Sequence, residues 1–215
     1  KIIHTSTSEV YGSAKKVPIL ENHLINPQSP YAASKASADN LVNSYYKSFN
    51  LPVVTLRPFN NFGPRQSLRA IIPTILTQVI KKKKFIMLGN MNSTRDFTFV
   101  EDTVQAYFKA LNNTKCIGHV INVGNNFEIS IKNIVNEVKK ISGKQIKVKT
   151  DKKRLRPKNS EVNRLYSSNK KAIKILKWKP KYNGIKGFKS ALKLTYNWYK
   201  KKENLKNFKS EIYNQ

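Results

Sequence analysis

Residues 29–56 read SPYAASKASADNLVNSYYKSFNLPVVTL, a stretch that predicts a helix followed by a buried strand. Ser29 suits the N-cap of a helix and Pro30 its first turn. Apolar residues then recur at helical spacing to about Phe49. The run PVVTL at 52–56 is almost continuously apolar, which is typical of a strand covered on both faces. The stretch therefore predicts an α/β unit.

The same alternation extends in both directions along the chain. KIIHT at residues 1–5 is another apolar run, and the chain opens inside it. Continuous apolar strands that alternate with helices indicate a parallel sheet, so the chain is assigned to the α/β class. Further helices are expected at 71–84, 101–111, 130–142, 168–176 and 184–199, and further strands at 85–88, 120–123 and 145–149, before a polar tail after Lys200.

The composition narrows the possible functions. The 215 residues carry a formal net charge of +29, which suits nucleic acid, an anionic membrane surface or a small anionic substrate. The lysines are spread along the chain, and this favours a solvated basic surface. One cysteine, Cys116, and three histidines argue against a disulfide or a metal site. Without a bilayer-spanning apolar run or a signal-peptide pattern, a soluble cytoplasmic protein with no membrane partner is expected.

Tyr31 and Lys35 are four residues apart near the start of the predicted helix, so they share one of its faces. A neighbouring ammonium group favours the ionised form of a phenol, which can then take a proton from an alcohol. The pair therefore suits the oxidation of a hydroxyl group. Tyr-x-x-x-Lys alone is a weak signal, because any amphipathic helix can produce it as a surface pair.

Three blocks of residues give this pair a context. They are Thr7-Ser8-Glu9-Val10-Tyr11-Gly12, Ser29-Pro30-Tyr31-Ala32-Ala33-Ser34-Lys35 and Arg57-Pro58-Phe59-Asn60-Asn61-Phe62-Gly63-Pro64-Arg65. Each block lies where a predicted strand ends or a predicted helix begins, the edge at which ligands bind in open α/β sheets. Together they resemble the extended short-chain dehydrogenase/reductase family of NAD-dependent epimerases and dehydratases. The Thr-Ser-Glu block resembles its nucleotide-sugar 4,6-dehydratases.

The likeness continues to about residue 200, and one part of it is more specific. The run Gly63-Pro64-Arg65-Gln66-Ser67 before Arg69-Ala70 is similar to bacterial dehydratases of the legionaminic-acid type. The family's first strand, its Gly-x-x-Gly-x-x-Gly phosphate loop and the acidic residue for the adenosine ribose are absent. The chain is therefore expected to lack about a hundred N-terminal residues. Alone, it is expected neither to bind NAD tightly nor to be active.

The resemblance implies a Rossmann-type doubly wound parallel sheet with a small C-terminal α/β substrate-binding cap. It also implies NAD as the cofactor, a nucleotide-diphosphate sugar as the substrate, and a homodimer formed through the helix that carries Tyr31 and Lys35. The implied pathway is the biosynthesis of sugars for bacterial surface polysaccharides. It further implies how the chain is divided into domains. The C-terminal half of the NAD-binding domain would span 1–58, and the chain would return to that domain at 96–124. The substrate-binding cap would span 59–95 and 125–200, and a polar tail would follow at 201–215.

The resemblance also implies catalytic roles. Tyr31 would take the proton from the sugar O4 as hydride leaves C4 for NAD, while Lys35 holds ribose hydroxyls and Thr7 hydrogen-bonds O4. Glu9 would then remove the C5 proton, which the C4 ketone acidifies. Ser8 stands where many sugar dehydratases carry the aspartic acid that protonates the departing C6 hydroxyl, so the acid for that step stays open. In the alternative interpretation, Thr7 and Glu9 are a strand-end cap and a turn residue.

Binding roles are implied for residues further along the chain. Pro58 and Asn60 would contact the cofactor, and Asn60 could also reach the sugar. Arg95 and Arg156 are assigned to the substrate diphosphate, with Arg69 a weaker candidate, because a planar guanidinium grips phosphate oxygens in pairs. The alternatives are a turn asparagine and surface ion pairs of the arginines with Asp96 or Glu161.

Three other functions stay open beside the favoured 4,6-dehydratase. Nucleotide-sugar decarboxylases of the same family also carry Thr-Ser-Glu. A 4-epimerase fits less well, because Glu9 has no task in a simple epimerase. A basic nucleic-acid-binding module would use the net charge, and its binding would fall steeply with salt, yet no aromatic and basic motif supports it.

Overall fold

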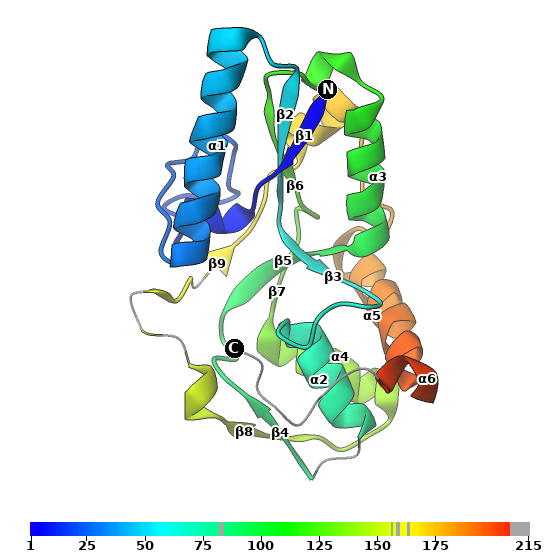
Figure 1. Cartoon of the computed structure of the whole chain (residues 1–215). Coiled ribbons are helices and arrows are strands. Elements are labelled where there is room, and N and C mark those ends of the chain that lie inside the picture. Colours follow the sequence, from blue (N-terminus) through cyan, green and yellow to red (C-terminus); the bar gives the residue numbers. More distant parts are fainter. Residues whose placement is uncertain (82–83, 156, 158–159, 163, 207–215) are drawn as a thin grey trace.

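The computed structural model describes residues 1–81, 84–155, 157, 160–162 and 164–206. A three-stranded parallel sheet has the order β1-β2-β6, formed by Ile2–Thr5, Val53–Pro58 and Val120–Val123. Helices α1 (Pro30–Phe49) and α3 (Val100–Leu111) lie on opposite sides of this sheet (Figure 1). The predicted α/β class and its parallel sheet are confirmed.

Helix α1 begins and ends as its sequence dictates. The Ser29 hydroxyl accepts a hydrogen bond from the Ala32 backbone N–H at 3.1 Å, and Pro30 occupies the first turn. The helix ends at Asn50, which adopts a left-handed conformation with φ of 52°. Only Ala32, Ala36 and Asp39 are buried within it. Two alanines let the helix lie close to the sheet, and the buried aspartate needs partners there.

A second group of strands lies outside this three-stranded sheet. Strand β5 is central: it pairs in parallel with β3 and β9 and antiparallel with β7. A separate parallel pair, β4 with β8, lies at the far end of the molecule (Figure 1). The bounds are Asn60–Phe62 for β3, Phe85–Leu88 for β4, Thr94–Phe99 for β5, Glu128–Ser130 for β7, Lys147–Thr150 for β8 and Arg164–Leu165 for β9.

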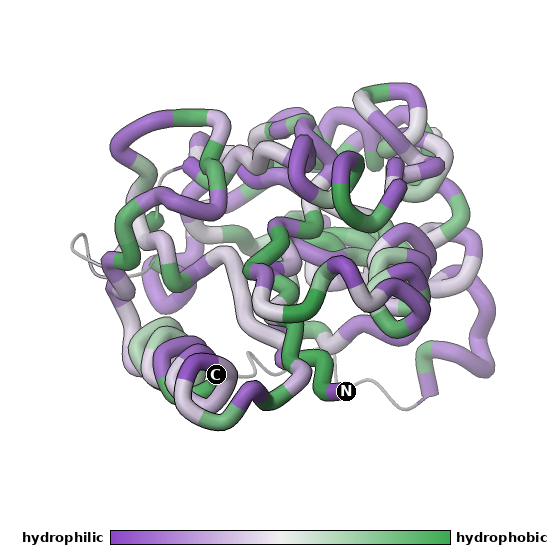
Figure 2. Tube along the Cα trace, turned by 90° about the horizontal axis from the view of Figure 1, so that it is seen from above, coloured by the Kyte–Doolittle hydropathy of each residue, from purple (hydrophilic) through white to green (hydrophobic). Residues whose placement is uncertain are grey.

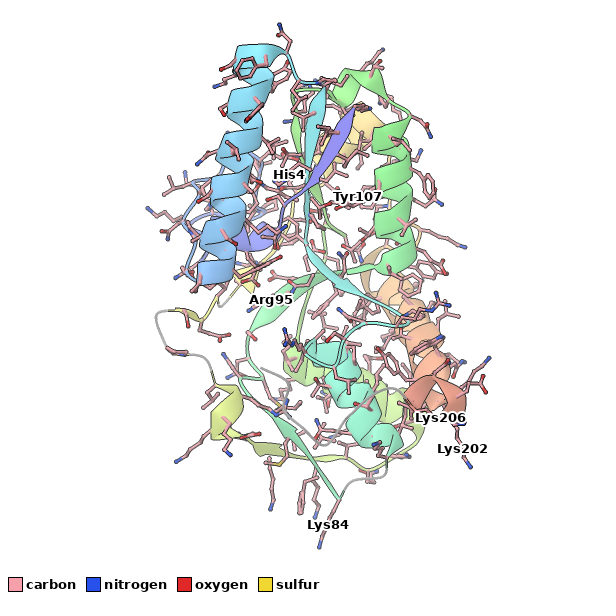
Figure 3. The ribbon with its side chains drawn as sticks, in the orientation of Figure 1. His4, Lys84, Arg95, Tyr107, Lys202 and Lys206 are labelled. Carbon is pink, nitrogen blue, oxygen red and sulfur yellow. The ribbon has the colours of Figure 1, made fainter. Side chains whose placement is uncertain are left out.

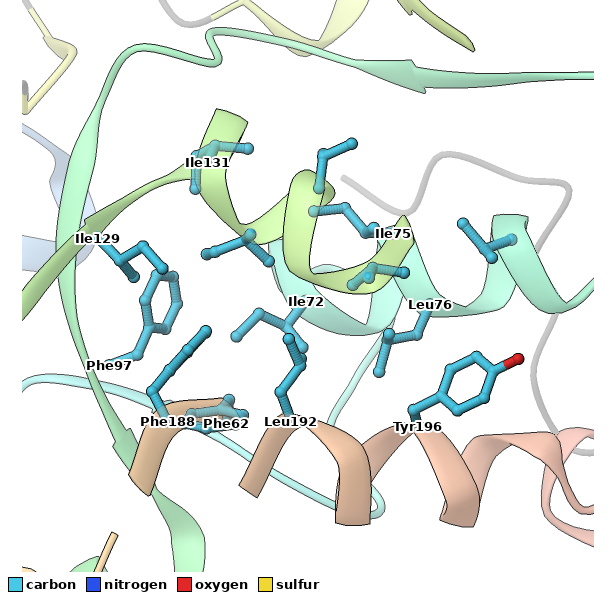
Figure 4. Close-up of a cluster of buried hydrophobic side chains, with 14 of the residues drawn as sticks. Phe62, Ile72, Ile75, Leu76, Phe97, Ile129, Ile131, Phe188, Leu192 and Tyr196 are labelled. Atoms are coloured by element: carbon cyan, nitrogen blue, oxygen red, sulfur yellow. The ribbon is translucent and has the colours of Figure 1, made fainter. Parts of the chain in front are cut away.

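Three helices pack around the main hydrophobic core, which Figure 4 shows in close-up. They are α2 (Ile71–Ile80), α4 (Ile131–Ser142) and α5 (Gly184–Lys200). The rings of Phe62, Phe97 and Phe188 meet at its centre, with centroids 5.2–6.2 Å apart. Burying each phenylalanine contributes about 1.5–3 kcal/mol. This core fixes β3 and β5 against α5.

The structure differs from the sequence expectations in its short elements. Strands β3, β5, β7 and β9 were not predicted. Residues 172–176 form a π-helix within the helix expected at 168–176, and Lys202–Leu205 form a short helix, α6, where a frayed tail was expected. Residues 207–215 of that tail lie outside the described part. Strand β5 was not predicted, because its sequence TRDFTF contains two charged residues. Residues 95–99 are nevertheless buried.

Hydrophilic and hydrophobic residues are interspersed along the whole trace, as Figure 2 shows. Among the described residues, no helix combines the length and apolarity needed to cross a membrane. The same part of the chain contains no cluster of three or more histidine, cysteine, aspartate or glutamate side chains suited to a metal ion.

Candidate active site

The Thr-Ser-Glu-Val-Tyr-Gly block forms a short 3₁₀ helix, η1 (Ser8–Tyr11), directly after β1. The Thr7 hydroxyl accepts a hydrogen bond from the Glu9 backbone N–H at 3.2 Å and so caps this turn. Gly12 closes it with φ of 61°, and a Cβ there would lie 2.0 Å from the Asn26 carbonyl oxygen. Ser8 is buried, whereas Glu9 is only partly buried. The geometry of this turn therefore fixes the position of the Glu9 side chain beyond the end of β1.

Glu9 lines a pocket of about 260 Å³ between η1 and the second group of strands. Three more predicted site residues, Asn60, Arg69 and Arg95, line the same pocket. They come from β3, from the loop before α2 and from β5. Ligand sites are concave and bring a few polar groups together, and this pocket has that character. Four of the residues that line this pocket were therefore predicted from the sequence as site residues.

The other predicted site residues in the described part of the chain lie outside the lining of this pocket. Tyr31 is 55% exposed on α1, and the Lys35 ammonium donates to the Thr5 carbonyl oxygen at 3.0 Å. Lys35 therefore contacts the carboxyl end of β1, the end at which η1 also begins, and Tyr31 lies one turn before it on α1. Thr7 is buried beneath the turn, and Pro58 instead borders an apolar groove between β1 and α3 that also contains Tyr107 (Figure 3).

Two arginines of the pocket, Arg95 and Arg154, pair with acidic neighbours. Arg95 is only 9% exposed, and its guanidinium lies 3.8 Å from the Glu161 carboxylate, so this pair is inside the pocket wall and not on the open surface. Arg154 donates to Asp151 at 3.1 Å. With Arg69, three arginines and two glutamates line the pocket. Figure 3 shows Arg95 in the middle of the view, whereas Lys84, Lys202 and Lys206 lie toward its lower edge.

The pocket also contains residues that the sequence did not single out. Arg154 and Gln66 line it, and Gln66 lies in a run that indicated only the family resemblance. Glu161 was considered only as a surface partner for an arginine. Arg156, which was assigned to the diphosphate, lies outside the described residues. Only the folded chain brings residues this far apart in sequence to one pocket.

Asp96, next to Arg95, joins three segments of the chain below the pocket. Its carboxylate accepts the Asn125 backbone N–H at 2.8 Å, the Ser167 backbone N–H at 3.1 Å and the Ser167 hydroxyl. Burial raises the pKa of Asp96 to about 6, against the opposing effect of these donors. A Cβ on Gly124 would lie 2.2 Å from the Ser167 hydroxyl oxygen. This packed junction holds β5, and with it Arg95, in place.

A second buried network lies under η1. The Arg57 guanidinium donates to the Asp39 carboxylate at 3.0 Å and to the Tyr11 hydroxyl at 2.9 Å. Asp39 also contacts His4 at 2.8 Å and accepts the Ser6 hydroxyl at 2.9 Å. Burial raises the pKa of Tyr11, although Arg57 acts in the opposite direction. The network connects α1, β1, β2 and η1, and of these elements α1 and η1 carry predicted catalytic residues.

Comparison with known proteins agrees with this architecture. Residues 1–190 match the family model described as GDP-mannose 4,6 dehydratase. The chain is 32% identical to a dTDP-D-glucose 4,6-dehydratase of Homo sapiens over 98% of its length, and 38% identical to one of Dictyostelium discoideum over 66%. It spans 59% and 35% of these relatives.

Solved structures show the same arrangement of elements. A dTDP-glucose 4,6-dehydratase from Bacillus anthracis, in complex with NAD, superposes with a TM-score of 0.84 at 32% identity, covering 97% of this chain and 64% of that one. A UDP-glucuronic acid 4-epimerase from Bacillus cereus, in complex with UDP-glucuronic acid and NAD, gives 0.83 at 32% identity, covering 92% and 60%. The chain belongs to the GDP-mannose 4,6 dehydratase family, within the extended short-chain dehydrogenases/reductases.

Proposed function

We propose that the protein carrying this chain is a nucleotide-sugar 4,6-dehydratase that forms a 4-keto-6-deoxy sugar. The observation that supports this most is Glu9, whose carboxylate-bearing side chain lines a pocket that also contains Arg69, Arg95 and Arg154. A carboxylate can remove a carbon-bound proton next to a ketone, and arginines bind a diphosphate. We further propose a legionaminic-acid-type enzyme that supplies sugars for bacterial surface polysaccharides.

The residues of this chain fit one end of an NAD molecule. Lys35 contacts the carboxyl end of β1, where ligands bind in α/β sheets, Tyr31 lies one turn before it on α1, and Asn60 follows β2 at the same edge. The 215 residues contain no Gly-x-x-Gly-x-x-Gly loop for the pyrophosphate. When bound, NAD supplies the acceptor for the hydrogen removed from C4 and its donor to C6. Lys35 and Asn60 would hold its nicotinamide-side ribose.

The chain's own residues carry the proton transfers. Tyr31 takes the proton of the O4 hydroxyl, and Thr7 positions O4. Glu9 then removes the proton at C5, which the ketone at C4 has made acidic, and the hydroxyl at C6 departs as water. Ser8, like Thr7, is buried outside the pocket lining, and the group that protonates the departing hydroxyl stays unassigned.

The pocket arginines are proposed to bind the substrate diphosphate. Arg95 is the strongest candidate, because burial strengthens its attraction for an anion. Arg154, which was not predicted as a site residue, is a further candidate for binding the diphosphate beside Arg69. The assignment of Arg156 to the diphosphate stays a prediction. Sugar hydroxyls would then lie toward Glu9 and Asn60.

The mass of the product tests the proposed reaction. A panel of nucleotide-linked hexoses and N-acetylhexosamines is incubated with the enzyme and NAD, and the products are analysed by mass spectrometry. The expected product has lost one water without net consumption of NAD, because the hydrogen removed at C4 returns at C6. Release of carbon dioxide from a uronic acid would instead identify a decarboxylase. An isomer of unchanged mass would identify an epimerase, the activity named for one of the similar solved structures.

We also propose a homodimer formed through α1. Leu41, Tyr45 and Phe49 recur along this helix and are 60%, 48% and 72% exposed, an apolar stripe that contacts little within the chain. Phe49→Asp is expected to convert the dimer to a monomer in sedimentation-velocity experiments, because a charge in an apolar interface remains unpaired. Ser44→Asp, also on an exposed part of α1 but outside the stripe, serves as the control. A monomeric unaltered protein would contradict the proposal.

A further inference from the structure

Tyr11 is a buried titratable residue that none of the proposed proton transfers uses. Its side chain has no exposed surface. Its ring packs against Phe59 and stands nearly perpendicular to His23, with centroids 6.5 and 5.7 Å away. Burial raises the pKa of Tyr11, so the side chain stays a neutral phenol at physiological pH. Its hydroxyl is therefore available for hydrogen bonds and not for proton transfer.

Side chains from two neighbouring strands hold this hydroxyl. It donates to Asn122 Oδ1 of β6 at 2.8 Å and accepts the guanidinium N–H of Arg57 on β2 at 2.9 Å. The Asn122 amide is itself fixed, because its nitrogen donates to the Ile19 carbonyl oxygen at 3.1 Å. The Arg57 guanidinium also lies 4.9 Å from the centre of the Tyr11 ring. The end of η1 is therefore tied to both β2 and β6.

The position of Tyr11 constrains that of Glu9, because both belong to the single turn of η1. The Gly12 backbone N–H donates to the Glu9 carbonyl oxygen at 3.1 Å and closes this turn. The Val10 carbonyl oxygen accepts the Asn26 backbone N–H at 2.9 Å. A 3₁₀ turn contains only about three residues, so its backbone moves as one body. Any backbone shift that displaces Glu9 must therefore pull the Tyr11 hydroxyl away from its partners.

We propose that Tyr11 is a positioning residue for the elimination step and holds Glu9 in reach of the C5 proton through the backbone of η1. This inference rests on the proposed function. A displacement of about 1 Å at a catalytic group can slow a reaction about a hundredfold, so a small shift of η1 is enough to matter. Tyr11 itself contacts neither the substrate nor the proton that is transferred.

Oxidation at C4 uses α1, and this helix has anchors of its own. The Lys35 ammonium donates to the Thr5 carbonyl oxygen at 3.0 Å. The Asp39 carboxylate accepts the Ser6 hydroxyl at 2.9 Å. Both contacts remain when the Tyr11 hydroxyl is removed. Its loss is therefore expected to slow the elimination and to leave the oxidation nearly unchanged.

Tyr11→Phe tests this difference, because it removes the hydroxyl and keeps the ring. The NAD-loaded protein that carries this chain is mixed, in excess, with dTDP-glucose, UDP-N-acetylglucosamine or GDP-mannose. The absorbance of reduced NAD follows the oxidation, and mass spectrometry of quenched samples gives the share of oxidised sugar that retains its C6 hydroxyl. Elimination is expected to slow about tenfold, so this share rises, while NAD is reduced at nearly the unaltered rate.

Two further variants calibrate the experiment. Glu9→Gln lacks the base itself and gives the share at its upper limit. Leu176→Ala is the control for lost stability, since Leu176 is buried in the cluster that contains Val54 and Trp178. The share is a ratio within the folded molecules, so a smaller folded fraction does not change it. Leu176→Ala is therefore expected to leave the share as it is in the unaltered protein.

The opposite results separate the inference from the proposed function. An unchanged share in Tyr11→Phe, or an equal slowing of oxidation and elimination, overturns the positioning role alone. A similar rise in Leu176→Ala also overturns it, because the share would then follow stability. If the unaltered protein dehydrates none of the three nucleotide sugars, the proposed function fails and the inference with it.

Arg57→Lys covers the case in which Tyr11→Phe does not fold. A single ammonium group cannot donate to both Asp39 and Tyr11 in the divergent directions of a guanidinium, and the carboxylate attracts it more strongly. The Tyr11 hydroxyl then keeps Asn122 as a partner but loses the donor from β2. The share of oxidised sugar with its C6 hydroxyl is expected to rise here as well. An unchanged share in Arg57→Lys would overturn the positioning role.

Discussion

Glu9→Gln is expected to stop turnover of the nucleotide sugar while leaving the oxidation at C4 intact. Glutamine has nearly the shape of glutamate but cannot accept the C5 proton, and removal of a general base lowers rates by about 10²–10⁴-fold. The expected product is a nucleotide 4-keto sugar that retains its C6 hydroxyl, detected by mass spectrometry under single-turnover conditions. In deuterated water, the C5 position should also fail to exchange.

Glu161→Gln is the matched control for this experiment. Glu161 is the second glutamate of the pocket lining, and it faces Arg95 at 3.8 Å. Its loss is expected to change the affinity for the substrate and to leave C5 exchange in place. Normal turnover in Glu9→Gln would remove Glu9 from the mechanism. Loss of C4 oxidation in that variant would show that Glu9 acts before the elimination.

The fold could be predicted from the sequence wherever local signals agree. In α1, a capping serine, a proline in the first turn and a helical repeat coincide, and the expected helix is the one observed. The apolar runs of β1, β2 and β6 were likewise predicted as strands. Strand β5 could not be recognised, because Arg95 and Asp96 interrupt its apolar pattern and their burial depends on partners far away in sequence.

The candidate site was predictable only in part, for the same reason. Glu9 and Arg95 stand in blocks whose residue types suggest chemistry, and the structure places both at one pocket. Their catalytic and binding roles stay predictions. Glu161 and Gln66 have no local signal, since a glutamate or a glutamine in a loop is ordinary. Asp39 did leave a signal: it follows Tyr31 and Lys35 at helical spacing, on the side of α1 that faces the sheet.

Arg57→Met is expected to lower the free energy of unfolding by about 3–5 kcal/mol, a large fraction of the stability of an ordinary domain. The Arg57 guanidinium is buried and contacts the carboxylate of Asp39 and the hydroxyl of Tyr11. Methionine fills similar space but leaves the Asp39 charge with His4 and Ser6 as its remaining partners among the described residues. Urea unfolding of the unaltered and variant proteins, with ΔG extrapolated to water, measures the difference.

Arg164→Met separates burial from charge as the cause of this effect. Arg164 also pairs with a carboxylate, donating to Glu128 at 2.9 Å, but its side chain is 49% exposed. Water replaces a lost partner at such a site, so its removal is expected to cost less than about 1 kcal/mol. Arg57→Lys should lie between the two, because a single ammonium cannot reproduce the divergent contacts of a guanidinium. Equal losses for Arg57→Met and Arg164→Met would show that the network under η1 contributes no more than a surface pair. The alignment of Tyr31 with Glu9 would then depend on the packing of α1 alone.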